Sequence, residues 1–516
     1  MNKKYALILL AMALIVVQQT QSQDLHVSAT GTFFVAPKSD INVTGSLEVV
    51  AGGDVTISSD ATHSGSLIVS GAATGVISYQ KHIPDANWHF VSAPVETQSI
   101  NDFVLDAANG IPTSGLNNYA VSVYNNTNAA GTRWEYYSAA GTHPANAAGN
   151  FTTGKGYSNK RTAAGYYTFK GTMATADVVV TTASSTAHKW EVVGNPYSSF
   201  LPANSLANGT NNVLAQNIDN LEVCFKGLYF WNGTAYQAIN HATEALHLTP
   251  GQAFMVRTRA NGATFTFPEN LQTAQVAAAT TFYKGSETPE IILSLLSGTV
   301  TKTTILKYFS NTSTGLDPGY DAGTYIDTTP TFAIDTHLVS DSQGIDFTLQ
   351  CLPNNNFETS IVPLSIKAVA NESITFSADA INLPDGLKIF LEDKEAQTIT
   401  DITTVSHQVT PNKTLNGIGR FYLHTAASVL STEDSGFATT LNIYKTSNTN
   451  VRITGLQPQG TAVVKLYSLV GKEVMMYAFK METVNDIALP KNLATGLYLL
   501  QLVANGAKQT KKLIIE

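Results

Sequence analysis

Two segments carry the residue types of known chemical motifs without completing them. Residues 149–156 read GNFTTGKG and nearly match the phosphate-binding loop G-x-x-x-x-G-K-[ST], but the last position is Gly, so the hydroxyl that ligates Mg²⁺ is missing. His241 and His247 flank Glu244, whereas a zinc-protease helix needs H-E-x-x-H, which places two histidines one turn apart. We therefore expect neither a nucleotide site nor a zinc site here.

A third segment clusters carboxylates in a Gly-rich turn. Asp317, Asp321 and Asp327 lie in and after the stretch LDPGYDAG. Carboxylate and carbonyl oxygens are the ligands that Ca²⁺ prefers, and calcium often staples extracellular β proteins. Asp and Gly are also the residues that tight turns require. The sequence leaves both interpretations open, and calcium is the one cofactor it suggests.

The remaining motif search favours a protein that is not an enzyme. The chain has no G-x-S-x-G nucleophile elbow and no recognisable pair of catalytic carboxylates. Its two cysteines, Cys224 and Cys351, fall in different predicted modules, so they form either a disulfide or two buried thiols. The net charge of −8 argues against nucleic acid and against anionic membranes as partners.

Composition and the first residues predict an exported protein. Lys3 and Lys4 precede an apolar run and the small residues of Thr20–Ser22, which is the pattern of a signal peptide over residues 1–22. No later segment is long and apolar enough to be a transmembrane span. Charged residues make up only 13% of the chain, and uncharged hydroxyl and amide side chains supply the polarity, as suits strands and turns.

Alternation of apolar and polar residues predicts an almost entirely β protein of several domains. Residues 23–80 repeat a Gly turn followed by a short strand, at Gly31, Gly45 and Gly65, which favours a β-solenoid-like module over a hairpin meander. Residues 286–425 alternate between turn signals and predict a β-sandwich. Residues 426–440 are a linker candidate, rich in Ser, Thr and Ala.

Residues 81–285 contain an internal duplication, with copies at about 86–185 and 186–275. The pattern W-x-x-V-x-x-P occurs at Trp88 and again at Trp190, and Trp134, Gly154 and Thr168 find counterparts at Trp231, Gly251 and Thr266. The offset stays near one hundred residues throughout. We expect two similar β units in which the four tryptophans are structural core anchors, because aromatic side chains dominate cores.

The C-terminal residues 441–516 alternate cleanly and carry a specific set of motifs. They include LVGKEV around Gly471 and Lys472, LATGLY ending in Gly496 and Tyr498, and the basic and apolar end at Lys511 and Lys512. In this order and spacing, the segment resembles the type A C-terminal sorting domain of the Bacteroidetes type IX secretion system. The resemblance implies an Ig-like fold, with these six residues as the sorting signal. It also implies partners in the outer-membrane translocon and its sorting peptidase, and a location outside the outer membrane.

The predicted fold class is all-β and multidomain: a short β-solenoid-like module, an internally duplicated β-sandwich region, a further β-sandwich and an Ig-like sorting domain. Two function classes remain. The first is a non-catalytic, adhesin-like cell-surface or secreted protein, with surface lipopolysaccharide or an extracellular glycan as further partners. The second is a carbohydrate-binding protein that uses exposed rings among Tyr136, Tyr137, Tyr166 and Tyr167, although paired tyrosines in a strand place one ring inside.

Overall fold

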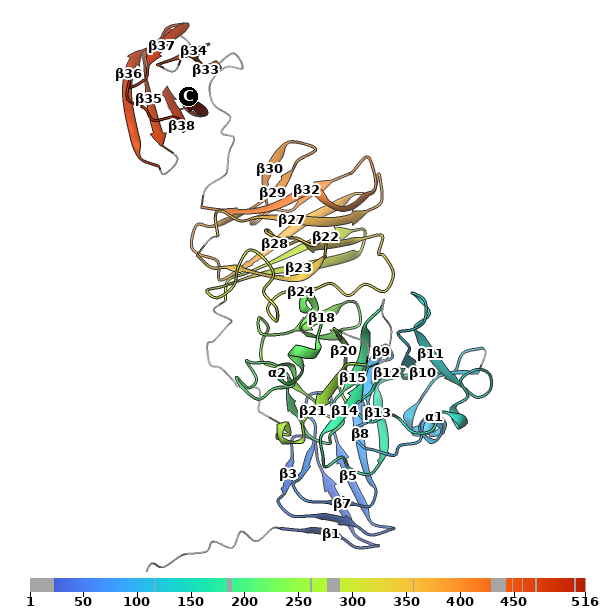
Figure 1. Cartoon of the computed structure of the whole chain (residues 1–516). Helices are drawn as coiled ribbons and strands as arrows, with labels where there is room; N and C mark the ends of the chain where they lie inside the picture. The colour runs from blue at the N-terminus through green and yellow to red at the C-terminus, as the bar shows by residue number, and fades with distance from the viewer. Residues whose placement is uncertain are drawn as a thin grey trace, which may run out of the picture. The chain divides into compact units, whose positions relative to one another are not determined.

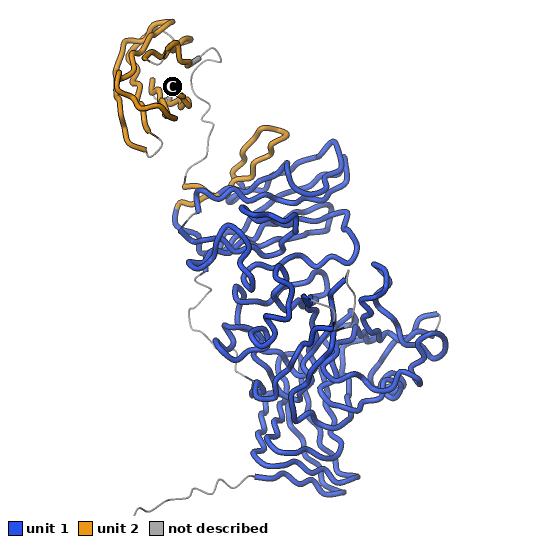
Figure 2. Tube along the Cα trace, in the orientation of Figure 1, with its two compact units in different colours: residues 1–385, 402–424 blue, residues 386–401, 425–516 orange. Residues whose placement is uncertain are grey.

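The structure is a computed structural model, and short strands dominate it (Figure 1). It describes residues 23–115, 117–182, 188–259, 262–275, 288–355, 357–427, 442–447, 449–456, 458–468, 471–504 and 507–515. The predicted signal peptide and nearly all of the predicted linker lie outside these residues. The chain divides into two compact units, residues 1–385 with 402–424 and residues 386–401 with 425–516 (Figure 2). The described residues contain no helix that is long and apolar enough to span a membrane.

The N-terminal module is a parallel β-solenoid of three short ladders, as predicted. The ladders are β1 (Leu25–Val27) with β4 (Leu47–Val49) and β7 (Ala73–Thr74), β2 (Thr32–Val35) with β5 (Asp54–Ser58) and β8 (Ile77–Ile83), and β3 (Asp40–Val43) with β6 (Ser66–Val69). In the second ladder, Val35 pairs with Ile57 and Ile57 with Tyr79, and all three are buried. Each rung therefore buries its inward side chains against the next rung.

The repeat unit of the solenoid differs from the one read in the sequence. The segments that follow Gly31, Gly45 and Gly65 become β2, β4 and β6, which belong to three different ladders. The Gly-then-strand motif therefore marks corners of the coil rather than the start of each rung. The true rung repeat is longer, since Thr32 pairs with Asp54 and Thr56 with Ser78.

The duplicated region forms two four-stranded antiparallel sheets with the same strand order. The first runs β11-β10-β12-β9 and the second β18-β17-β20-β15. Their strands are β9 (Trp88–Ser92), β10 (Asn118–Tyr124), β11 (Trp134–Ser138) and β12 (Gly156–Lys160), then β15 (Trp190–Gly194), β17 (Leu228–Trp231), β18 (Tyr236–Ile239) and β20 (Ala253–Arg257). In each copy a short helix, α1 (Ile100–Leu105) or α2 (Val213–Asn217), follows the first strand. The same topology thus occurs twice.

Each copy ends in a strand outside its four-stranded sheet. In the first copy, β13 (Gly165–Gly171) pairs with β8, so the last solenoid strand also belongs to this copy. In the second, β21 (Thr264–Phe267) pairs with β14 (Val178–Thr181). The predicted boundary between residues 80 and 81 therefore falls inside β8.

The predicted match of Trp134 with Trp231 is wrong. Trp134 begins the outer strand β11 and pairs with Tyr124, whereas Trp231 ends the inner strand β17 and pairs with Tyr236. Both hairpins thus close on a Trp–Tyr cross-strand pair, with the two rings exchanged between strands. Trp88 and Trp190 do match, because each begins the edge strand of its sheet.

The third module is a bent antiparallel and parallel sheet that packs on itself. Its strands run in the order β32-β27-β25-β26-β23-β22-β28-β31, and β25 (Ala333–Thr336) meets β26 (Phe347–Pro353) through the single pair Thr336–Phe347. The other strands are β22 (Glu290–Ser297), β23 (Val300–Phe309), β27 (Ile361–Ala368), β28 (Ile374–Ile381), β31 (His407–Val409) and β32 (Leu415–Ala426). Phe376 of β28 lies 4.8 Å from Phe421 of β32, between ring centroids, so the two halves face each other across a core.

The C-terminal unit contains a two-sheet sandwich. One sheet is β33-β34-β37 and the other β36-β35-β38-β39. The strands are β33 (Asn442–Ser447), β34 (Asn450–Thr454), β35 (Thr461–Ser468), β36 (Glu473–Lys480), β37 (Val484–Ala488), β38 (Gly496–Ala504) and β39 (Ala507–Ile515). Alternate side chains point inward, and Val464, Leu466, Leu500 and Leu502 are fully buried. The same unit includes the hairpin of β29 (Lys388–Asp393) and β30 (Thr398–Asp401).

Candidate ligand-binding pocket in the first repeat

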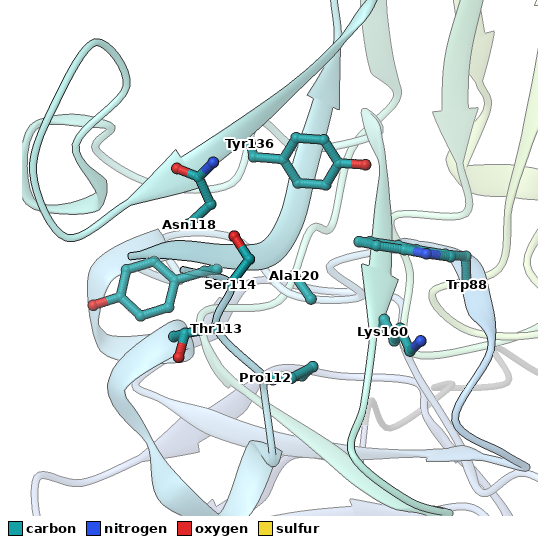
Figure 3. Close-up of a pocket in the computed structure, with 9 residues that line it drawn as sticks. Trp88, Pro112, Thr113, Ser114, Asn118, Ala120, Tyr136 and Lys160 are labelled. Carbon is teal, nitrogen blue, oxygen red and sulfur yellow. The ribbon is translucent and has the colours of Figure 1, made fainter. Parts of the chain in front are cut away.

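A pocket of ≈ 380 Å³ opens at one end of the first repeat's sheet (Figure 3). The edge strands β9 and β11, the inner strands β10 and β12, and the loop that precedes β10 all contribute to it. Its lining residues are Trp88, Pro112, Thr113, Ser114, Asn118, Tyr119, Ala120, Tyr136 and Lys160. Trp88 and Tyr136 come from opposite edges of the sheet, so the pocket extends across its full width.

Two aromatic rings form the apolar part of the pocket. The rings of Trp88 and Tyr136 lie 5.7 Å apart at 67°, and 39% of the Tyr136 surface is exposed. Trp88 is also partly exposed, although a ring of this size at the start of a strand normally buries its face. Partly exposed rings that flank a hollow offer flat apolar surfaces to a ligand.

Lys160 is the charged residue of the lining. It lies directly opposite Trp88 in the β9–β12 ladder, so the amine and the indole belong to the same end of the sheet. Among the described residues, no carboxylate forms an ion pair with it. The pocket therefore has one positive charge in a chain whose net charge is −8.

Backbone hydrogen bonds fix the loop that carries the polar groups. Ser114 N donates to Asn118 O at 2.9 Å, and Ala120 N donates to Pro112 O at 2.9 Å. Thr113 and Tyr119 form an isolated bridge between these two contacts. The side chains of Thr113, Ser114 and Asn118 line the pocket on this fixed frame, and each can donate and accept hydrogen bonds.

The second repeat shows the same place filled. Trp190 is fully buried, and the ring of Phe225 lies 5.6 Å from it at 80°. Phe225 belongs to the 3-10 helix η4 (Val223–Phe225), in the loop that precedes β17. Tyr325 packs on the same indole at 4.9 Å. The pocket of the first repeat is thus the open form of a position that the second repeat closes with its own side chains.

One matched hydrogen bond aligns the two loops. Thr162 N donates to Gly110 O, and Arg259 N donates to Asn220 O, in each case two residues after the end of the equivalent strand. Between Gly110 and Asn118 the loop reads GIPTSGLNN and contains no aromatic residue, whereas the loop of the second repeat contains Phe225. The loop ring that packs on Trp190 is therefore absent from the first repeat.

A larger groove of ≈ 850 Å³ lies near β18, β23 and β25, and several of its charged groups already have internal partners. Lys307 pairs with Glu290 at 3.1 Å. The Asp335 carboxylate accepts from Thr324 Oγ1 at 2.5 Å, and burial raises the pKa of this carboxyl to about 6. Because internal partners hold these groups, the smaller pocket is the stronger candidate for a ligand.

The carboxylates predicted as a calcium site do not come together. Asp321 is buried and accepts from Asp317 N and Cys351 N at 2.6 and 2.7 Å, and burial raises its pKa to about 7. Asp327 instead forms an ion pair with Arg133. Among the residues that the structure describes, no three acidic, His or Cys side chains could share a metal. The turn interpretation therefore replaces the calcium site.

The four tryptophans predicted as core anchors differ in burial. Trp190 is fully buried, while Trp88, Trp134 and Trp231 remain partly exposed. Trp134 packs against Phe90 and Tyr124, and Trp231 packs against Tyr236. Trp88, which faces the pocket, packs against the ring of Tyr136. The prediction that all four tryptophans are core anchors was therefore too general.

The tyrosine pairs place one ring inside and one outside. Tyr137 and Tyr167 are buried, whereas Tyr136 and Tyr166 are exposed by 39% and 42%. Of the four, Tyr136 lines the pocket. Sequence reasoning missed Pro112, Ser114 and Lys160. The sequence did contain a signal for Lys160. The spacing from Lys160 to Arg257 equals the spacing from Gly154 to Gly251, so the internal duplication matches Lys160 with a second cation.

The two cysteines and the sorting-signal residues are placed as follows. Cys224 and Cys351 are buried free thiols in one apolar cluster. Gly471 and Lys472 form the turn between β35 and β36, with Gly471 N donating to Ser468 O. Gly496 begins β38, Tyr498 OH donates to Ala494 O at 3.0 Å, and Lys511 and Lys512 are exposed on β39.

The C-terminal sandwich and its turn and strand motifs define a class, the proteins that the type IX secretion system exports. Residues 441–516 match the family described as "Secretion system C-terminal sorting domain", so this chain is a secreted or cell-surface protein that interacts with the type IX secretion machinery. Residues 5–424 match the family described as "Domain of unknown function (DUF8693)", and the chain belongs to that family. No curated protein matches the chain.

Proposed function

We propose that this protein is a non-catalytic, adhesin-like surface protein whose body binds carbohydrate through the pocket of the first repeat. The observation that carries the proposal is the contrast between the repeats: Phe225 packs on the fully buried Trp190, while Trp88 stays partly exposed beside the pocket. An exposed Trp–Tyr pair forgoes the stabilisation that burial of its rings would give, and a ligand that covers the rings gains it on binding.

The chemistry of the lining suits a sugar. A pyranose ring has an apolar face of C–H groups and an equatorial belt of hydroxyls. Trp88 and Tyr136 provide flat apolar surfaces for that face, and Thr113, Ser114 and Asn118 provide donors and acceptors for the hydroxyls. The lining contains no carboxylate, imidazole or thiol, which supports binding rather than reaction.

The route to the surface completes the proposal. The general secretory machinery removes residues 1–22, the translocon recognises residues 441–516, and the sorting peptidase cuts within residues 426–440. The body is then released or joined to surface lipopolysaccharide. The bacterium belongs to the Bacteroidetes, in keeping with this route.

A glycan array tests the binding function. The purified full-length chain should bind a limited set of glycans, and Trp88→Ala should abolish that binding because it removes one aromatic wall. Tyr166→Ala is the matched control, since this exposed ring lies outside the pocket. Equal binding by the wild type and Trp88→Ala, or no binding by the wild type to any glycan, would overturn the proposal.

A further inference from the structure

The second repeat contains an internal occupant of the position that the first repeat leaves open. The occupant has two parts, the ring of Phe225 against Trp190 and the carboxylate of Glu222 against Arg257. The Glu222 Oε2 atom lies 2.8 Å from Arg257 Nε and 3.4 Å from Lys189 Nζ. Arg257 in turn lies over the Phe225 ring at 4.3 Å. A flat apolar group and a carboxylate therefore satisfy this position together.

The first repeat keeps the receiving groups of this arrangement. Trp88 begins β9 as Trp190 begins β15, and Lys160 pairs with Trp88 in the ladder as Arg257 pairs with Trp190. Both repeats thus place a cation opposite the first tryptophan of the edge strand. The indole and the positive charge are common to both copies.

The first repeat has lost both parts of the occupant. Two residues beyond Gly110 stands Pro112, where the second repeat has Glu222 two residues beyond Asn220. The same loop, residues 110–118, contains no aromatic residue, where the loop of the second repeat has Phe225. Pro112 lines the pocket without a charge. Lys160 therefore faces a hollow whose equivalent in the second repeat holds a carboxylate.

We propose that the pocket binds an acidic sugar, a hexuronic acid whose carboxylate pairs with Lys160 while its apolar face stacks on Trp88. This proposal rests on the proposed function and names its ligand class. The ligand supplies the two groups that Glu222 and Phe225 supply in the second repeat. Charge-assisted contacts to a carboxylate are among the stronger polar interactions.

The polar lining favours a sugar over an acidic aromatic peptide. Thr113, Ser114 and Asn118 offer side-chain hydrogen bonds on the wall opposite Trp88, as hydroxyls around a ring require (Figure 3). A peptide would rely on main-chain contacts along a free strand edge. The backbone beside the pocket is instead already paired, because Thr113 forms a β-bridge with Tyr119.

Calorimetric titration of the full-length chain with glucuronic acid and glucose oligosaccharides of equal length tests the proposal. We expect the uronic series to bind about tenfold more tightly at low salt, a difference that falls as ionic strength rises. Lys160→Gln should remove the preference, so that the uronic and neutral series bind with equal affinity. Pro112→Glu should restore the internal carboxylate beside Lys160 and weaken uronic binding, and Pro112→Gln is its matched control.

Each outcome is informative. Equal affinity for both series in the wild type, or an unchanged preference in Lys160→Gln, would overturn the acidic ligand while the proposed carbohydrate function stands. Binding of neither series, together with binding of a Phe-Glu peptide that Trp88→Ala abolishes, would overturn both. Circular dichroism of each variant shows whether the β fold is retained.

Discussion

At the scale of single residues, Trp88 and Trp190 occupy equivalent positions with opposite uses. Trp190 is fully buried under Phe225, Tyr229 and Tyr325, so Trp190→Ala should cost about 3–5 kcal/mol of stability. Trp88→Ala removes a partly exposed ring and should lower the thermal midpoint far less. Thermal unfolding of both variants followed by circular dichroism checks this. Equal shifts would contradict the different roles assigned to the two residues.

A second residue-scale prediction concerns pH. Burial raises the pKa of the Asp335 carboxyl to about 6 from an ordinary value of 3.8, so folding favours its protonated form. Its contribution to stability is complete below pH 3.8 and is lost as the pH rises through 6, a change of about 3 kcal/mol. Asp335→Asn keeps an acceptor for Thr324 without the charge.

The stability of Asp335→Asn relative to the wild type should therefore increase between pH 4 and pH 7. Thermal midpoints of both proteins, measured in the same buffers across that range, give the comparison. A difference that stays constant with pH would show that Asp335 does not titrate there.

At the scale of the element, the solenoid corner at Gly75 is crowded by backbone. Gly75 has a φ of +87°, and a Cβ added there would lie 2.1 Å from Val49 O. Gly344 has a φ of +75° but open space around it. Gly344→Ala should cost about 1 kcal/mol from backbone strain alone. Gly75→Ala must also move the rung below and should cost clearly more.

Limited proteolysis distinguishes these two glycine variants locally. Gly75→Ala should open the solenoid to cleavage near β4 and β7, whereas Gly344→Ala should leave the solenoid resistant. Resistance in both variants would mean that the corner tolerates a side chain.

Element types were predictable from the sequence, and pairings were less so. Alternation of apolar and polar residues predicted the all-β class. Because successive side chains of a strand point to opposite faces, it also predicted that each tyrosine pair has one buried and one exposed ring. The solenoid repeat was misread because several corners of the coil carry a Gly turn, so the motif recurs faster than the rung. Trp134 and Trp231 were mismatched because either strand of a hairpin can hold the larger ring of a cross-strand pair.

The pocket itself could not be predicted from local sequence patterns. Its residues come from four strands and a loop, and that loop lacks an aromatic side chain like Phe225 of the second repeat. An absent side chain leaves no periodic signal. Only the comparison of the two repeats reveals it, and that comparison needed the paired hydrogen bonds of Gly110 and Asn220. The calcium interpretation of the acidic turn depended in the same way on position in the sequence, which places Asp327 near Asp321, whereas Asp327 pairs with Arg133.

At the scale of the whole molecule, the sorting domain decides where the body works. Deleting residues 441–516 should keep the protein inside the outer membrane, because the remaining chain lacks the segment that the type IX machinery recognises. Immunoblots of periplasmic and surface fractions measure this, with intact-cell labelling of the full-length chain as the control. Undiminished surface labelling of the truncated protein would contradict the assignment of this domain.

Strand β8 has a mechanical consequence for a protein exposed at a cell surface. It is hydrogen-bonded to β5 in the solenoid and, from Ile77 to Ile83, to β13 in the first repeat. A load directed along β8 would act parallel to a ladder of seven paired residues, which would have to break together rather than one after another. The junction therefore resists shear, because the paired residues share the force, whereas a flexible linker between modules would extend under the same force.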